Sequence, residues 1–172
     1  MIRNCKMQDE VSDSTGLLIS ILVRYPEVAS INFEPKNQTL KFTFIVEFKF
    51  KKQECYDFER KLEDSIAAYN YLEKNDTGKV AMCYQHLDNF TAIEISRDVE
   101  NIMHGEIALI VEFFRDSFEG LLVTESNGDL VEEDLTVQEE LIEHMLDSIR
   151  ESKDDKNLFA FRDEGKVLVF DK

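Results

Sequence analysis

The chain has 172 residues, 43% of them hydrophobic, and its 36 acidic and 20 basic side chains give a formal net charge of −16. This length suits one well-filled core, so we expect a single domain over residues 1–172. The acidic excess argues against DNA or RNA binding, because such binding requires Lys and Arg to neutralise phosphates. The charge chiefly favours solubility; an acidic face could also meet a basic partner or imitate nucleic acid.

The three cysteines are far apart and odd in number: Cys5, Cys55 and Cys83. Because they form no CxxC pair and no metal-ligand spacing, the sequence supports neither a zinc site nor a disulfide framework. The N-terminus lacks the apolar core of a signal peptide, and the apolar run 17–23 is too short to span a bilayer. We therefore expect a soluble cytoplasmic protein without membrane association.

The first elements are a helix and a strand. Residues 1–12 are polar and acidic, which predicts a loose N-terminal segment. Residues 16–25 are apolar on nearly all sides and predict a short helix that ends before Pro26. A strand over 28–33 and a turn over 34–37 follow, so this strand should fold back onto the next one as a hairpin.

The clearest pattern lies in residues 40–51, which read L-K-F-T-F-I-V-E-F-K-F-K. Every even position is apolar, and every odd position except Ile45 is polar or charged. Successive side chains of a strand point to opposite faces of a sheet. The alternation therefore predicts a half-buried, antiparallel strand across the whole segment.

The period then changes to that of a helix. Over 53–75, apolar residues spaced three or four apart predict an amphipathic helix: Cys55, Phe58, Leu62, Ile66, Tyr69 and Leu72. A second hairpin is predicted from 79–86 and 90–96, which reverses at 87–89.

Residues 98–119 admit two interpretations. Apolar residues at helical spacing follow Asp98, a residue type favoured at the N-cap, and precede Gly120, so the pattern favours a helix (Met103, Ile107, Ile110, Phe114 and Phe118). However, the apolar run 107–114 would also suit a buried strand, and periodicity alone cannot settle a short run.

The C-terminal part predicts one more helix and one more hairpin. Residues 121–124 suit a short strand, and 125–135 form an acidic loop. Thr136 and Glu139 have the spacing of a capping box, so a helix should begin there. Its inward stripe would be Val137, Leu141, Met145 and Ile149. The last hairpin joins 157–162 to 166–170.

Helices and hairpins thus alternate along the chain. This order predicts an α+β fold, in which an antiparallel sheet is built from successive β-hairpins and amphipathic helices pack mainly on one face.

No motif identifies an enzyme. The six glycines are isolated, so no glycine-rich phosphate loop is present, and there is no G-x-S-x-G elbow. His104 and Glu106 have the H-x-E spacing of zinc deaminases, but the P-C-x-x-C partner is missing. His144 follows Glu140 by four residues, a spacing that suits one metal or an ordinary solvated helix face. His86 has no evident partner.

The acidic loop is the best candidate for a hard cation, because calcium prefers several oxygen ligands in a flexible loop. Its ligands would come from residues 125–129 and 132–134. Alignment to an EF-hand on Gly128 places Val123 where the first acidic ligand belongs. The simpler interpretation is a solvated acidic loop, so we expect no metal and no cofactor.

These observations favour a non-enzymatic domain that acts through protein contacts, with self-association as a homodimer. A local basic patch of four lysines supports this hypothesis: Lys41, Lys49, Lys51 and Lys52. Lysines on an exposed strand also protect against edge-to-edge pairing, which is the alternative explanation. The competing hypothesis is an enzyme or small-ligand-binding protein whose site is assembled between helices and sheet. A third hypothesis is that the protein is a nucleic-acid mimic.

Overall fold

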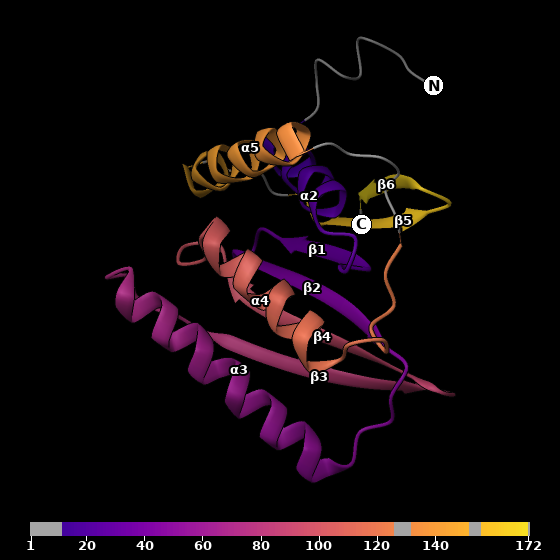
Figure 1. The fold of residues 1–172 in the computed structure, drawn as a ribbon. Helices are drawn as coiled ribbons and strands as arrows, with labels where there is room; N and C mark the ends of the chain where they lie inside the picture. The colour runs from indigo at the N-terminus through magenta and orange to yellow at the C-terminus, as the bar shows by residue number, and fades with distance from the viewer. Residues whose placement is uncertain (1–11, 126–131, 152–155, 172) are drawn as a thin grey trace.

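The computed structural model describes residues 12–125, 132–151 and 156–171. Within these ranges, four helices and six strands alternate in the predicted order: α2 (Asp13–Arg24), β1 (Ser30–Glu34), β2 (Thr39–Val46), α3 (Lys52–Leu72), β3 (Val80–Leu87), β4 (Phe90–Asp98), α4 (His104–Ser117), α5 (Glu132–Glu151), β5 (Leu158–Asp163) and β6 (Lys166–Asp171) (Figure 1). The prediction of an α+β fold is confirmed. The loose segment predicted over 1–12 lies outside the described residues, apart from Ser12, whose hydroxyl accepts a hydrogen bond from the Thr15 amide and caps α2.

The six strands form one antiparallel sheet in the order β3-β4-β2-β1-β5-β6. The β1–β2 hairpin lies in the middle, with the β3–β4 hairpin beside β2 and the β5–β6 hairpin beside β1. The registers join distant parts of the chain, since Thr43 pairs with both Ser30 and Glu94, and Ser30 also pairs with Phe161. Three successive hairpins are therefore placed side by side.

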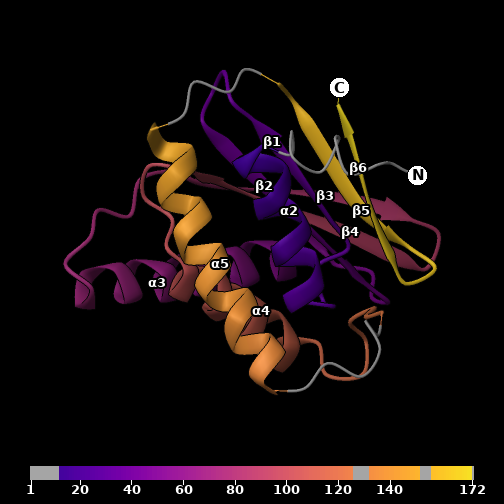
Figure 2. The ribbon, with the colours of Figure 1, turned by 90° about the horizontal axis from the view of Figure 1, so that it is seen from above.

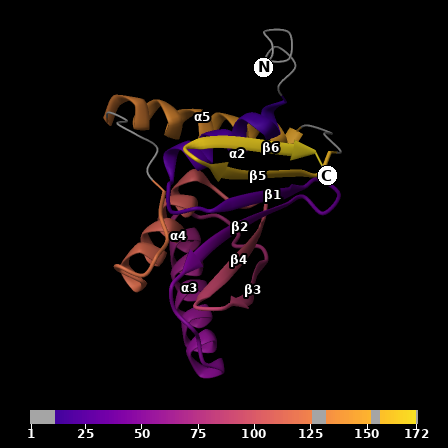
Figure 3. The same cartoon turned by 90° about the vertical axis from the view of Figure 1, so that its right-hand side faces the viewer.

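All four described helices lie on one face of this sheet. The helices α3 and α4 cover β2 to β4, whereas α2 lies over β1, β5 and β6 and α5 packs beside α2 (Figure 2). The opposite face of the sheet carries none of the described helices (Figure 3). No helix among the described residues is long and apolar enough to cross a membrane.

The apolar side chains of β2 lie at the centre of the core. Its apolar even-numbered residues are buried beneath the helices, and its odd-numbered residues lie on the helix-free face. Phe44 stacks on Phe114 of α4, with ring centroids 3.9 Å apart.

The strand ends at Val46 instead of Lys51, so the predicted extent was wrong. The chain bends there because the Glu47 amide donates to the Leu121 carbonyl oxygen and the Thr91 hydroxyl donates to the Phe48 carbonyl oxygen. Phe48 and Phe50 keep their apolar environment by packing on other aromatic rings, as Phe50 does on Phe118.

Residues 104–117 form a helix, so the strand alternative is wrong. Asp98 does not cap it, because the N-cap position belongs to Met103. The Asp98 carboxylate instead accepts hydrogen bonds from the Lys79 amide and the Asn101 side chain.

The last helix also begins elsewhere than predicted. Because α5 starts at Glu132, Thr136 lies inside it and the predicted capping box is wrong. The buried stripe is Ile142, Leu146 and Ile149, whereas Val137 and Leu141 are 52% and 36% exposed.

Candidate functional site

The helix-free face of the sheet changes in character from one side to the other. Strand pairing places one row of residues across all six strands: Cys83, Glu94, Thr43, Ser30, Phe161 and Leu168. The residues from β3, β4, β2 and β1 are small or polar, whereas those from β5 and β6 are large and apolar. The face is therefore a shallow floor with an apolar ridge along one side.

The ridge consists of three phenylalanines. Phe161 lies 5.5 Å from Phe159 and 5.6 Å from Phe170, measured between ring centroids, and it stacks on Phe170. Phe170 is 50% exposed. Phe159 and Phe161 are half-buried, so the cluster is a partly exposed apolar surface and a candidate for binding.

A cavity of about 410 Å³ opens between this ridge and the floor, and we call it the sheet-face cavity. Its walls are mostly apolar and come from distant parts of the chain: Pro26, Ala29, Ser30, Thr43, Ile45, Val123, Thr124, Glu125, Phe159, Phe161 and Arg162. A second hollow of about 300 Å³ adjoins it and shares Thr43. The two hollows extend the recessed surface from β5 to β3.

The segment after α4 supplies one wall of the cavity. The Val123 amide donates to the Ile45 carbonyl oxygen, and the Glu125 amide donates to the Pro26 carbonyl oxygen. Leu122 also forms an isolated bridge with Val46, which is all that remains of the short strand predicted over 121–124. This segment therefore runs beside the last residues of β2, which extend past the part of β2 that pairs with β1.

Arg162 closes the cavity from the helix side. Its guanidinium donates to the Leu22, Tyr25 and Val28 carbonyl oxygens around the end of α2. Burial lowers the pKa of Arg162 from its ordinary value. Because these contacts cap the C-terminal end of α2, they give Arg162 a structural role in holding β5 against that helix.

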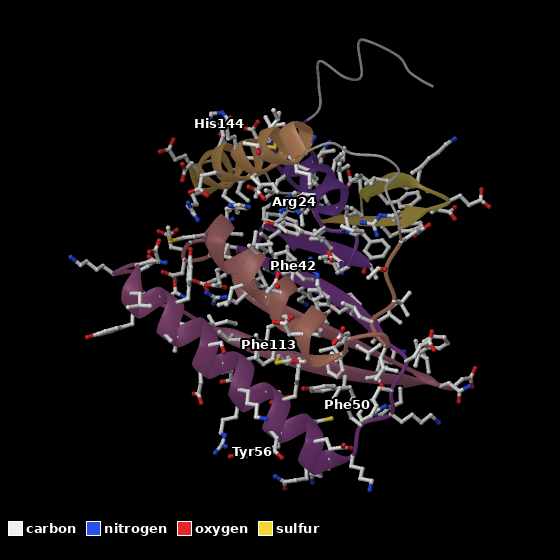
Figure 4. The ribbon with its side chains drawn as sticks, in the orientation of Figure 1. Arg24, Phe42, Phe50, Tyr56, Phe113 and His144 are labelled. Carbon is white, nitrogen blue, oxygen red and sulfur yellow. The ribbon has the colours of Figure 1, made fainter. Side chains whose placement is uncertain are left out.

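An aromatic hollow of about 370 Å³ lies on the other side of the molecule, between α3 and α4. Its rings come from three segments: Phe48, Phe50, Phe58, Phe113 and Phe118 (Figure 4). Glu54, Asp57 and Lys61 surround it with mixed charge. The sheet-face cavity is larger and opens onto a face without helices, so it is the stronger candidate site.

The structure separates one of the four predicted patch lysines from the others. Lys41 lies on the helix-free face, 2.8 Å from the Glu34 carboxylate, and a hydrogen bond to Glu34 raises its pKa. Lys49, Lys51 and Lys52 are exposed beyond the end of β2, at the start of α3. Their role in binding stays a prediction.

The three histidines lie apart from one another. The His104 Nε2 atom is 2.9 Å from the Tyr25 hydroxyl, and the His86 Nδ1 atom is 3.2 Å from the Thr91 hydroxyl. His144 is exposed on α5 (Figure 4). No cluster of metal-ligating side chains is found within the described ranges. Most of the predicted calcium loop lies outside those ranges.

Sequence reasoning missed a buried ionic cluster. Arg97 and Glu106 are both 0% exposed, and the Arg97 Nη2 atom donates to Glu106 Oε1 at 2.7 Å. Asn70 donates to the same oxygen at 2.9 Å. The cluster thereby links β4 to α3 and α4, and its closure to solvent makes it structural. The alternation of Ile93, Ile95 and Arg97 places the arginine on the buried face, which was the signal available in the sequence.

Tyr25 should make the folded state sensitive to alkaline pH. Burial raises its pKa to about 12, compared with about 10 in an unfolded chain. The neutral phenol is favoured in the folded protein, so this stabilisation is complete below pH 10 and is lost as pH rises towards 12. The loss amounts to about 3 kcal/mol of unfolding free energy.

Urea unfolding between about pH 9 and pH 12 tests this expectation. The decrease in stability over that interval should be smaller in Tyr25→Phe than in the wild type. Tyr71→Phe is the control, because Tyr71 is 78% exposed. An equal decrease in all three proteins would contradict the assignment to Tyr25.

Comparisons with protein-family models, curated proteins and solved structures found no match to this chain. The functional interpretation therefore rests on the geometry of the helix-free face.

Proposed function

We propose that this protein is a non-enzymatic binding domain that holds an apolar segment of a partner protein against the helix-free face of its sheet. The observation that carries the proposal is the sheet-face cavity beside the exposed ridge of Phe159, Phe161 and Phe170. A large apolar side chain inserted into the cavity would be removed from water, and the ridge would cover the residues next to it.

The charge of the chain defines the partner further. Glu94 and Glu125 line the two hollows of the face, and the whole chain carries −16. Basic residues beside the apolar anchor would therefore gain electrostatic attraction and a faster encounter. The same acidic charge disfavours nucleic acid as the partner. The unpaired thiols of Cys55 and Cys83 suit a reducing cytoplasm, where we place the protein.

An enzyme or small-ligand binder is the competing class, and the cavity volume falls within the range of ligand pockets. The polar groups of its wall favour binding over catalysis. They are three hydroxyls, the Glu125 carboxylate and a guanidinium that caps a helix. The ridge also extends the apolar surface beyond the cavity, as a partner protein needs and a small molecule does not.

Selection from a phage-displayed library of random peptides tests the proposal. The wild type should enrich peptides that combine large apolar and basic residues. Phe161→Ser and Phe170→Ser should each weaken the binding of those peptides about tenfold or more, because the buried area of one ring is lost. Tyr71→Ser, an equally drastic change on α3, should leave the binding unchanged.

Peptides that bind the Phe161→Ser and wild-type proteins equally would overturn the proposal, provided that melting curves show both to be folded. A thermal-shift screen against metals, nucleotides and metabolites addresses the competing class, because a ligand of the native state raises the melting temperature. A shift that Phe161→Ser abolishes would favour a small-molecule site.

A further inference from the structure

The outermost strand β3 has an unusual composition for the edge of a sheet. It reads V-A-M-C-Y-Q-H-L and contains no Asp, Glu, Lys, Arg or Pro. Each of the other five strands of the described sheet contains at least one charged residue. The whole chain is 33% charged. One of the two edge strands of the sheet is therefore the strand without charge.

An uncharged edge is exceptional because free edges normally carry devices against pairing with other chains. Such devices include lysines, prolines, bulges and very short strands. The opposite edge, β6, has Lys166 and Asp171 at its two ends. By contrast, β3 pairs with β4 over eight consecutive residue pairs without a bulge, from Val80 opposite Arg97 to Leu87 opposite Phe90. Its outer edge therefore offers a regular, unprotected ladder of backbone groups.

From these observations we infer that β3 is a dimerisation edge, which pairs in antiparallel orientation with β3 of a second copy of this chain. The two sheets then join into one continuous sheet across a two-fold axis. This inference concerns the edge of the sheet and does not depend on the proposed use of its helix-free face.

The uncharged β3 edge is where a second copy can approach with the least electrostatic repulsion. Two chains that each carry −16 repel one another unless they meet where charge is absent. The β3 strand provides such a place, because like charges would not lie opposite one another across the new pairing. Its half-buried Met82 and Tyr84 would lie on the helix side of the joined sheet, close to the same residues of the second copy.

The helix α3 strengthens the inference. Its N-terminal end reaches past β3, beyond the edge of the sheet (Figures 1 and 3). Tyr56, which is 60% exposed, lies on this overhanging part (Figure 4). A strand added to β3 would lie beside the overhang, and Tyr56 would gain a surface to cover.

Three lysines of the predicted interaction patch also lie at this end of α3: Lys49, Lys51 and Lys52. In the dimer they would approach a second chain in which acidic side chains outnumber basic ones. Because Glu54 and Asp57 lie on the same end of α3, each copy brings charges of both signs to this contact.

Light scattering over a concentration series tests the inference. The wild type should reach twice the chain mass of 20.1 kDa. The double variant Cys83→Lys and Gln85→Lys should remain at 20.1 kDa at the same concentrations. Both residues are exposed, and Cys83 lies opposite Glu94, so the added lysines should be tolerated by the monomer. The control Phe170→Lys adds a charge to the opposite edge and should remain dimeric.

Hydrogen exchange locates the interface independently. Raising the concentration should slow amide exchange in residues 80–87 of the wild type and leave it unchanged in the double variant. A wild type that stays monomeric overturns the inference and leaves the edge to a strand of another protein. A dimer protected elsewhere, or one that the two lysines do not weaken, overturns it as well.

Discussion

A Glu106→Ala variant is expected to lose about 3–5 kcal/mol of unfolding free energy. The substitution leaves the buried Arg97 guanidinium with the partly exposed Asp98 carboxylate, 3.2 Å away, as its remaining counter-ion. It also removes the oxygen that accepts a hydrogen bond from Asn70. Because whole domains are stable by only about 5–15 kcal/mol, this single change should bring the protein close to unfolding at room temperature.

Urea-induced unfolding measures this loss, and a second substitution separates its causes. The double variant Arg97→Met and Glu106→Leu removes both charges and fills similar volume, so it should recover most of the stability. The control is Glu34→Ala, which breaks the half-exposed ion pair with Lys41 and should cost less than about 1 kcal/mol. Equal losses in Glu34→Ala and Glu106→Ala would show that burial of the Arg97–Glu106 pair has no special consequence.

A Phe114→Ala variant is expected to lose a similar amount, about 3–5 kcal/mol, through a different mechanism. The Phe114 ring is fully buried and stacks on Phe44, and its centroid lies 5.2 Å from that of Phe58. Truncation leaves a cavity between α4 and the sheet that the two neighbouring rings cannot fill by small movements.

The same unfolding experiment measures this effect, and an intermediate variant tests its cause. Phe114→Leu should lose less than Phe114→Ala, since it leaves a smaller cavity. Phe170→Ala should cost well under 1 kcal/mol, about the effect of a surface substitution, because half of that ring already faces water. A Phe114→Ala loss as small as that of Phe170→Ala would contradict the central position assigned to this ring.

The hairpins and helices could be predicted because their signals are local. The alternation in β2 and the stripe of Phe58, Leu62 and Ile66 in α3 each describe one face of one element. Where the sequence misled, two local solutions were equally regular. In α5, stripes through Leu141 and through Ile142 both have helical spacing, and contact with α2 decides which one is buried. Likewise, the alternation of residues 40–51 continues after the backbone has left the sheet.

The candidate site could not be predicted because no single segment contains it. Pro26, Val123 and Phe161 meet at the sheet-face cavity only after strand pairing places β5 beside β1. Each residue alone is an ordinary apolar residue, and nothing near it in the sequence marks a cavity. The edge strand β3 is different, since its lack of charge is visible in the sequence. Its position at the edge, which gives that absence a meaning, follows from the strand order alone.

The strand order also determines how long each strand must wait for its neighbour while the chain is being synthesised. In the finished sheet β1 is an inner strand, flanked by β2 and β5, and Ser30 pairs with Phe161. At roughly 5–20 residues per second, the ribosome needs on the order of ten seconds to proceed from one of these residues to the other. During that interval the edge of β1 that will face β5 has no strand to pair with. The nascent chain therefore exposes the unpaired backbone groups of β1 in the middle of its future sheet. The β5–β6 hairpin covers these groups when β5 pairs with β1.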